Sequence, residues 1–96
     1  MPKRRYEAHR LDLNVIMHYL IPVMRLMRDG TTTTDAFAQV AKSRSVSAYT
    51  VYENCTRRLG MTTPEFVITA HSGRMKEHLL ATFPNDADLL VGVDIG

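Results

Sequence analysis

Apolar residues recur at helical spacing over most of the chain. The first such segment runs from about Glu7 to Asp29. Five of its apolar residues follow one another at three- and four-residue intervals, which places them on one helix face: Leu13, Ile16, Leu20, Val23 and Met27. Pro22 lies inside the segment and cannot donate a backbone hydrogen bond, so we expect a kink or a break near residues 20–22.

A second apolar strip, formed by Val15, Tyr19 and Leu26, widens the hydrophobic surface of this segment. The segment is therefore apolar over more than half of its circumference and needs cover on two sides. The chain's other helices can cover one side. For the second side we predict another copy of the chain, in a homodimer that uses part of the 13–27 surface. The alternative is a central helix buried wholly within one chain.

Turn and cap residues predict two helices after Gly30. A threonine among residues 31–34 is expected to cap the first, with Asp35 in the first turn where the helix dipole favours an anion. The apolar face of this helix is Ala36, Phe37, Val40 and Ala41. Ser47 is a good cap for the second, which is predicted to run through Val51 and Cys55 to Leu59, with Gly60 as its stop.

Two further helices complete the predicted fold. The run Thr62-Thr63-Pro64-Glu65 has the residue types of a helix start, and Phe66, Val67 and Ala70 follow as the core face of a helix that ends at Ser72-Gly73. The last predicted helix spans about residues 74–82, with Met75, Leu79 and Leu80 pointing inward. The chain is thus predicted to be all-α, a compact bundle of about five helices. Residues 91–96 are too short to assign to a strand or to disorder.

Charge divides the chain into three parts. Residues 1–5 read as a basic N-terminal arm, residues 6–84 as the helical domain and residues 85–96 as an acidic C-terminal tail. Residues 1–85 hold all twelve Lys and Arg and seven acids, a net +5, and the last eleven residues hold three acids and no base. A mildly basic body of this kind suits a polyanionic partner.

Composition and motif content exclude several classes of function. Ninety-six residues make one domain, and no apolar run reaches the roughly 18–20 residues of a membrane-spanning helix. We therefore predict a protein with no membrane partner. Cys55 is the only cysteine, which excludes a disulfide framework and favours a reducing cytoplasmic compartment. The histidines have no metal-ligand spacing, and no acid–base or nucleophile constellation appears, so we predict no metal, no cofactor and no enzymatic activity.

One segment carries a more specific signal. Within residues 37–56, Ala41 stands where two crossing helices need a small residue, Ser45 and Val46 occupy a turn, Ser47 caps the second helix, and Val51 faces the first. This pattern resembles the helix-turn-helix motif of bacterial and phage DNA-binding proteins. The resemblance predicts a helix-turn-helix within the bundle, in which helix 47–59 enters the major groove of double-stranded DNA. Ser45 departs from the usual glycine, at a position that often needs positive φ.

The resemblance assigns roles to the residues around this turn. The outward positions of the second helix are the candidates for reading bases: Ser47, Ala48, Tyr49, Tyr52, Glu53 and Thr56. The flanking cations and the basic arm are the candidates for phosphate contacts: Lys42, Arg44, Arg57, Arg58, Lys3, Arg4 and Arg5. Tyr49 and Tyr52 equally suit packing on a neighbouring helix or on a partner.

Two functions follow from these assignments. The first is a small DNA-binding protein, a transcriptional regulator or accessory factor of prokaryotic or phage type. The second is a helical protein-interaction module that keeps the helix-turn-helix shape without binding DNA. The outward face of the second helix lacks Arg, Lys, Asn and Gln at its first positions, which favours the second reading.

Overall fold

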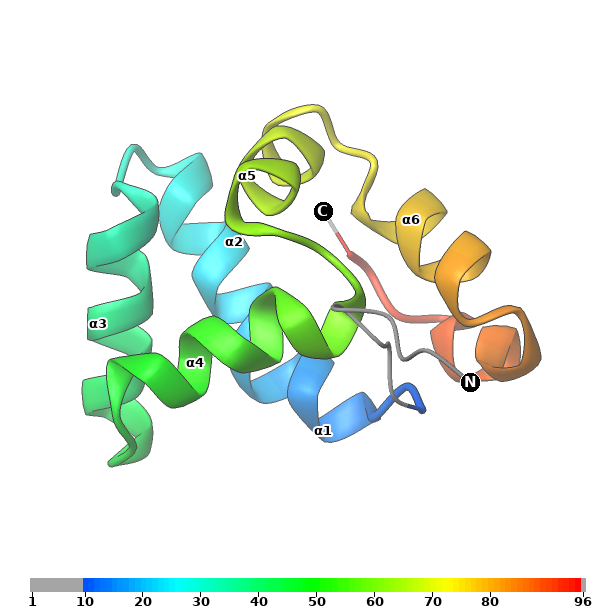
Figure 1. Cartoon of the computed structure of the whole chain (residues 1–96), viewed down its shortest axis with the longest axis horizontal. Helices are drawn as coiled ribbons and strands as arrows, with labels where there is room; N and C mark the ends of the chain where they lie inside the picture. Colours follow the sequence, from blue (N-terminus) through cyan, green and yellow to red (C-terminus); the bar gives the residue numbers. More distant parts are fainter. Residues whose placement is uncertain (1–9, 96) are drawn as a thin grey trace, which may run out of the picture.

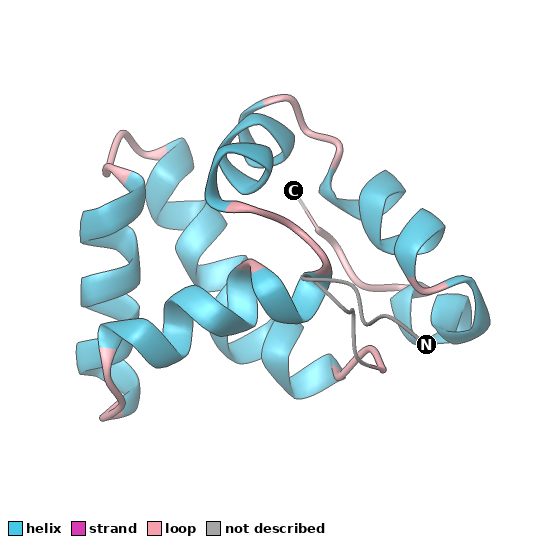
Figure 2. Cartoon of the chain, in the orientation of Figure 1, coloured by secondary structure: helices cyan, strands magenta, loops and turns pink. Residues whose placement is uncertain are grey.

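The described part of the chain, residues 10–95, is all-helical in a computed structural model (Figures 1 and 2). In order, it forms α1 (Leu13–Val15), the π-helical turn η1 (Ile16–Leu20), α2 (Ile21–Arg28), α3 (Thr33–Arg44), α4 (Ala48–Cys55), the 3-10 turn η2 (Arg57–Leu59), α5 (Thr63–His71), α6 (Met75–Thr82) and the 3-10 segment η3 (Pro84–Leu90). The predicted all-α fold is confirmed. The basic arm lies outside the described residues.

The first helix changes its hydrogen bonding where proline was expected to disturb it. It begins at Leu13 rather than near Glu7, because the Asp12 side chain accepts a hydrogen bond from the backbone N–H of Asn14 and caps it. Ile21 N–H donates to the carbonyl of Ile16, five residues back, whereas the N–H groups of an α-helix donate to the carbonyl four residues back. Pro22 then stands in the first turn of α2. The wider turn therefore lies directly before Pro22, the residue that cannot donate a backbone hydrogen bond.

The two apolar strips of this helix are largely covered within one chain. Ile16, Leu20 and Val23 have no exposed surface, and Tyr19 and Leu26 pack partly buried against the same core. Leu13 is the exception, with 38% of its surface exposed. The reason given above for a homodimer through the 13–27 surface is therefore removed, because the chain's own helices supply both covers.

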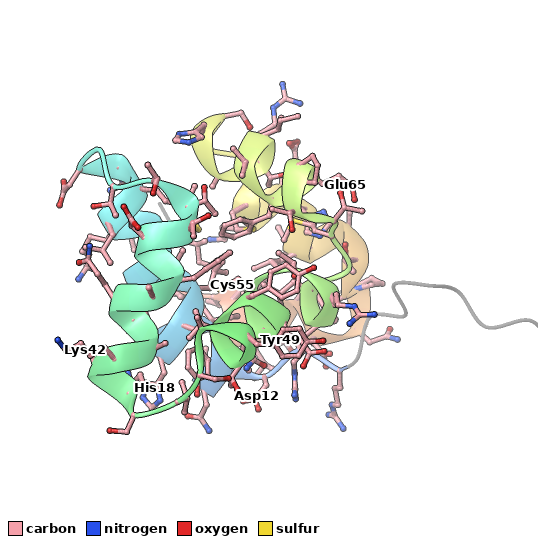
Figure 3. All side chains as sticks on the ribbon, turned by 60° about the vertical axis from the view of Figure 1, so that its left-hand side comes forward. Asp12, His18, Lys42, Tyr49, Cys55 and Glu65 are labelled. Carbon is pink, nitrogen blue, oxygen red and sulfur yellow. The ribbon has the colours of Figure 1, made fainter. Side chains whose placement is uncertain are left out.

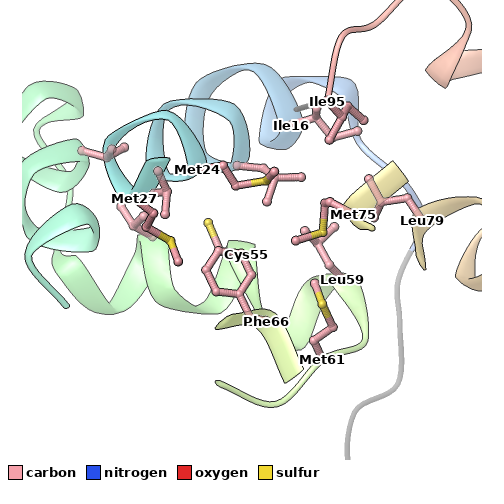
Figure 4. Close-up of a cluster of buried hydrophobic side chains, with 14 of the residues drawn as sticks. Ile16, Met24, Met27, Cys55, Leu59, Met61, Phe66, Met75, Leu79 and Ile95 are labelled. Carbon is pink, nitrogen blue, oxygen red and sulfur yellow. The ribbon is translucent and has the colours of Figure 1, made fainter. Parts of the chain in front are cut away.

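The core is one cluster in which side chains of every α-helix except the short α1 meet those of the C-terminal segment. In Figure 4, Met27, Cys55 and Phe66 converge from α2, α4 and α5. Phe66 also lies against Phe37 of α3, with ring centroids 5.8 Å apart. Leu80, predicted to point inward, is instead 39% exposed, because Met75 and Leu79 already fill the inner side of α6.

The C-terminal segment belongs to this core. Leu90 and Ile95 are buried, although residues 91–95 form neither helix nor strand. The Asp86 carboxylate accepts a hydrogen bond from the backbone N–H of Leu11 at 3.1 Å and lies 3.7 Å from the Arg10 guanidinium. An acid of the predicted acidic tail thus ties the C-terminal segment to the start of the described chain.

Candidate nucleic-acid interface

The turn between α3 and α4 is closed by backbone hydrogen bonds. Ser45 N–H donates to the Lys42 carbonyl at 3.3 Å, and Val46 N–H donates to the Ala41 carbonyl at 3.0 Å. This pair of bonds is a Schellman motif, which requires a left-handed residue between the two helices. Ser45 has φ 57° and ψ 41°, and it is the one residue other than glycine with positive φ in the described part of the chain. The turn therefore keeps the left-handed geometry that glycine usually supplies.

The second helix begins directly after this turn. The Ser47 hydroxyl accepts a hydrogen bond from Thr50 N–H at 3.1 Å and lies 3.0 Å from the Thr50 hydroxyl. Val51 is fully buried, and Ala41 on α3 is 4% exposed. The two helices pack against each other, with Val51 and Ala41 in the shared core. Ser47 and Ala48 face solvent, as predicted, but the Ser47 hydroxyl is committed to capping.

The end of α4 differs from the prediction. The helix stops at Cys55 instead of Leu59, and Thr56 leaves helical geometry with φ −117° and ψ −82°. Its hydroxyl donates to the Tyr52 carbonyl at 2.7 Å, and its own carbonyl accepts from Leu59 and Met61 N–H. Thr56 has no exposed surface, so its assignment as an outward, base-reading residue is wrong. Threonine hydroxyls often bond the carbonyl four residues back, which is the one local signal for this break.

The two tyrosines of α4 have different surroundings. Tyr52 is half-buried and packs edge-on against Phe37, with ring centroids 6.1 Å apart, so it faces α3. Tyr49 is 57% exposed (Figure 3) and stacks partly on Tyr52 at 5.7 Å. Of the two, Tyr49 is the side chain that a ligand of α4 can reach.

Glu53 and Arg57 share hydrogen bonds with Tyr49. The Tyr49 hydroxyl donates to Glu53 Oε2 at 3.3 Å, and Arg57 Nη1 donates to the Tyr49 oxygen at 3.2 Å. Arg57 Nη1 also lies 3.4 Å from Glu53 Oε2. The three side chains, called here the Tyr49–Glu53–Arg57 cluster, form an exposed group without net charge that extends from α4 to η2.

The other flanking cations also differ from one another. Arg58 pairs with Asp12 at 3.7 Å, and its Nε is shielded from solvent without a hydrogen-bond partner in the described chain. Lys42 and Arg44 are exposed, and neither has an ion-pair partner among residues 10–95. In Figure 3, Lys42 extends from the side of α3 that faces away from Tyr49. Arg44, next to the turn, is therefore the cation best placed beside the start of α4.

Two further side chains that could carry chemistry, Cys55 and His78, have defined surroundings. Cys55 is fully buried, and burial raises the pKa of its thiol, which keeps it a small apolar core residue. His78 lies with Nε2 2.8 Å from the Leu59 carbonyl. Because a carbonyl only accepts, Nε2 carries the proton. No group of three or more His, Cys, Asp or Glu side chains in residues 10–95 is arranged to hold a metal ion.

A hollow of about 310 Å³ lies away from α4, between α2 and the end of α5. Met24 and Met27 line its inner side, and Arg28 and His71 line it further out. Arg28 stands in the last turn of α2, where a cation stabilises the helix dipole. Its charge thus has a structural explanation that does not require a ligand.

No protein-family model, no curated protein and no solved structure matches this chain. None of the helices in the described residues is long and apolar enough to cross a membrane.

Proposed function

We propose that this protein binds double-stranded DNA and acts as a transcriptional regulator or accessory DNA-binding factor of prokaryotic or phage type. In this proposal the exposed start of α4 enters the major groove. Ala48 contacts a thymine methyl group, and the Tyr49 hydroxyl bonds a base edge or a phosphate. Arg44 contacts a phosphate beside the turn and fixes the register without reading sequence.

The observation that carries the proposal is the left-handed turn at Ser45 directly before a capped helix. It presents three consecutive exposed residues, Ser47 to Tyr49, at the start of a helix whose other side is fixed in the core by Val51. An α-helix with its side chains is about 10–12 Å in diameter, so a helix such as α4 fits the major groove, which is about 12 Å wide. A short, rigidly held helix with an exposed beginning has the dimensions that groove binding needs.

The test is a fluorescence-anisotropy titration of labelled duplex DNA of mixed sequence at two salt concentrations. We expect Arg44→Gln to weaken binding to all sequences alike and to reduce the slope of log affinity against log salt by about 1. The matched control is Lys76→Gln, which removes an exposed cation from α6. Equal effects of the two substitutions would show general electrostatics rather than a site at the turn.

The base-reading part of the proposal has its own variant. Tyr49→Phe removes one hydroxyl from the exposed side of α4. If Tyr49 bonds a base, its loss should change the preference among duplexes by about 1–3 kcal/mol, measured by competition between sequences. A uniform change across all sequences would instead place Tyr49 on the backbone.

The second candidate function is a protein-interaction module. The specific observation that favours it is the Tyr49–Glu53–Arg57 cluster, since an exposed aromatic ring in a group without net charge suits a protein partner. If the unmodified protein shows no affinity for duplex DNA even at low salt, this function replaces the first. A homodimer remains a prediction to be measured by sedimentation, and it would need a surface other than the covered strips of residues 13–27.

A further inference from the structure

Arg57 is paired with an anionic group, the Glu53 carboxylate, and the phosphates of DNA are anionic groups of a similar kind. A guanidinium binds carboxylate and phosphate oxygens with similar geometry. In the free protein, Arg57 Nη1 lies 3.4 Å from the Glu53 carboxylate, and the Tyr49 hydroxyl donates to the same carboxylate oxygen. Glu53 therefore occupies, within the chain, the place that a phosphate would take beside Arg57.

The cluster is accessible enough to exchange that partner. The Glu53 and Arg57 side chains are each 45% exposed, so water and a backbone phosphate can reach them. An ion pair as exposed as this one contributes little to stability, so its two side chains can separate at low cost. A phosphate approaching Arg57 would also bring a second anion next to the Glu53 carboxylate, which like-charge repulsion opposes.

We propose that Glu53 is an intramolecular competitor that holds Arg57 away from DNA phosphates, and that Tyr49 positions its carboxylate. The inference rests on the proposed DNA binding and adds regulation of that same surface. Its consequence is low affinity for DNA of arbitrary sequence. Arg57 contacts a phosphate only where Glu53 has another partner, such as the exocyclic amino group of cytosine in the major groove.

The proposal is tested with four forms of the full chain: the parent, Glu53→Gln, Arg57→Gln and the double variant. Their binding to one duplex of arbitrary sequence is measured as a function of salt. We expect Glu53→Gln to steepen the slope of log affinity against log salt by about 0.9, the value for one added phosphate contact. The double variant should return to the parental slope, because the added contact belongs to Arg57.

The control is Glu77→Gln, which makes the same charge change on α6. A gain of the same size in this control, or a gain from Glu53→Gln that persists in the double variant, would overturn the proposal. Either result would mean that Glu53 acts by general repulsion and not through Arg57. An unchanged slope in Glu53→Gln would overturn it as well.

Failure of the proposed function is a different result. In that case none of the four forms binds duplex DNA at low salt. If the parent binds DNA and Glu53→Gln has the same slope of log affinity against log salt, the DNA-binding proposal stands. Only the proposal that Glu53 competes for Arg57 is then wrong. Circular dichroism of each variant checks that the fold is retained, which the exposure of these side chains leads us to expect.

Discussion

Two turns in this molecule have the same backbone hydrogen bonds, but they join their helices differently. Between α5 and α6, Gly73 N–H donates to the Ala70 carbonyl and Arg74 N–H to the Thr69 carbonyl. This is the Schellman pattern already described at Ser45. Gly73, like Ser45, has a positive φ, of 73°. Even so, α3 and α4 are in much closer contact with each other than α5 and α6 are.

The residues that follow each turn account for the difference. Val46, directly after Ser45, is partly buried against the core, and Ser47 then caps α4. Arg74, directly after Gly73, is exposed and provides no side-chain cap for α6. The turn itself only ends a helix. An apolar residue after the turn holds the next helix against the previous one, and a charged residue in that place leaves it free to pack elsewhere.

The largest effect is expected from Phe66→Ala, because α5 is held by the core and not by α6. Phe66 is fully buried against Phe37, and removing such a ring costs about 3–5 kcal/mol of unfolding free energy. The control Ile68→Ala, on the same helix but 68% exposed, should change it by less than about 0.5 kcal/mol. Urea unfolding measures both, and similar losses would mean that α5 is held in some other way.

The lesson of the two turns is tested by exchanging the residues that follow them. Val46→Arg removes a partly buried apolar side chain, and we expect a loss of about 1 kcal/mol in urea unfolding. Amide hydrogen exchange should show the loss concentrated in α4. Arg74→Val is the reciprocal control and should leave stability nearly unchanged. A Val46→Arg variant as stable as the parent would refute the explanation given for the packing of α3 and α4.

A smaller effect of opposite sign is expected at the turn residues themselves. Ser45→Gly places glycine where φ is positive and should raise stability by about 0.5–1 kcal/mol, measured as an increased thermal midpoint. Gly73→Ala should lower stability by a similar amount. The space around Gly73 is open, so that cost comes from its backbone conformation alone. If Ser45→Gly destabilised the fold, its hydroxyl would have a role that the hydrogen bonds above do not include.

The smallest effect concerns the start of α5, where Glu65 and Thr62 form a capping box that α6 lacks. Hydrogen bonds from Thr62 hold the pKa of Glu65 below its usual value, with a smaller contribution from His78. A lowered folded-state pKa adds stability above the usual value of about 4.3, and this is lost as pH falls through the lowered pKa. Thermal midpoints of the parent and Glu65→Gln should therefore converge as pH falls from neutral through the lowered pKa of Glu65. A constant difference would mean that the charge of Glu65 has no part in the cap.

The positions of most helices could be predicted because their ends carry local signals. Ser47 and Thr62 cap the helices that they were expected to cap, and Thr32 is the threonine among residues 31–34 that caps α3. The first helical segment ends directly before Gly30, as predicted, whereas Gly60 follows the 3-10 turn η2 and not α4. Each signal acts within a few residues of the chain, so the neighbouring sequence is sufficient to find it. The candidate site could be predicted in part for the same reason. Ser45 marks the place of the turn, and Ser47 marks the exposed start of α4.

The details of that site depended on more distant residues. Helical spacing placed Thr56 on the outer face of α4 with Tyr49 and Tyr52, but spacing assumes that the helix continues, and α4 ends at Cys55. Tyr52 turns toward α3 because Phe37 offers it an aromatic edge from another helix. Periodicity gives the relative directions of side chains on one helix, and it contains no information about the partners that another helix supplies.

By itself, then, the sequence determined the all-helical class, the caps of α3, α4 and α5 and the place of the turn between α3 and α4, because caps, glycines and periodicity act locally. Only the tertiary structure decided the left-handed conformation of Ser45, what covers the first helix, where Ile95 packs and which cations of residues 10–95 have an ion-pair partner there. The hydrogen bond from Leu11 to Asp86 joins residues 75 positions apart. Contacts of this kind depend on the whole packed chain, since each partner acquires its neighbours only when the helices between them have folded.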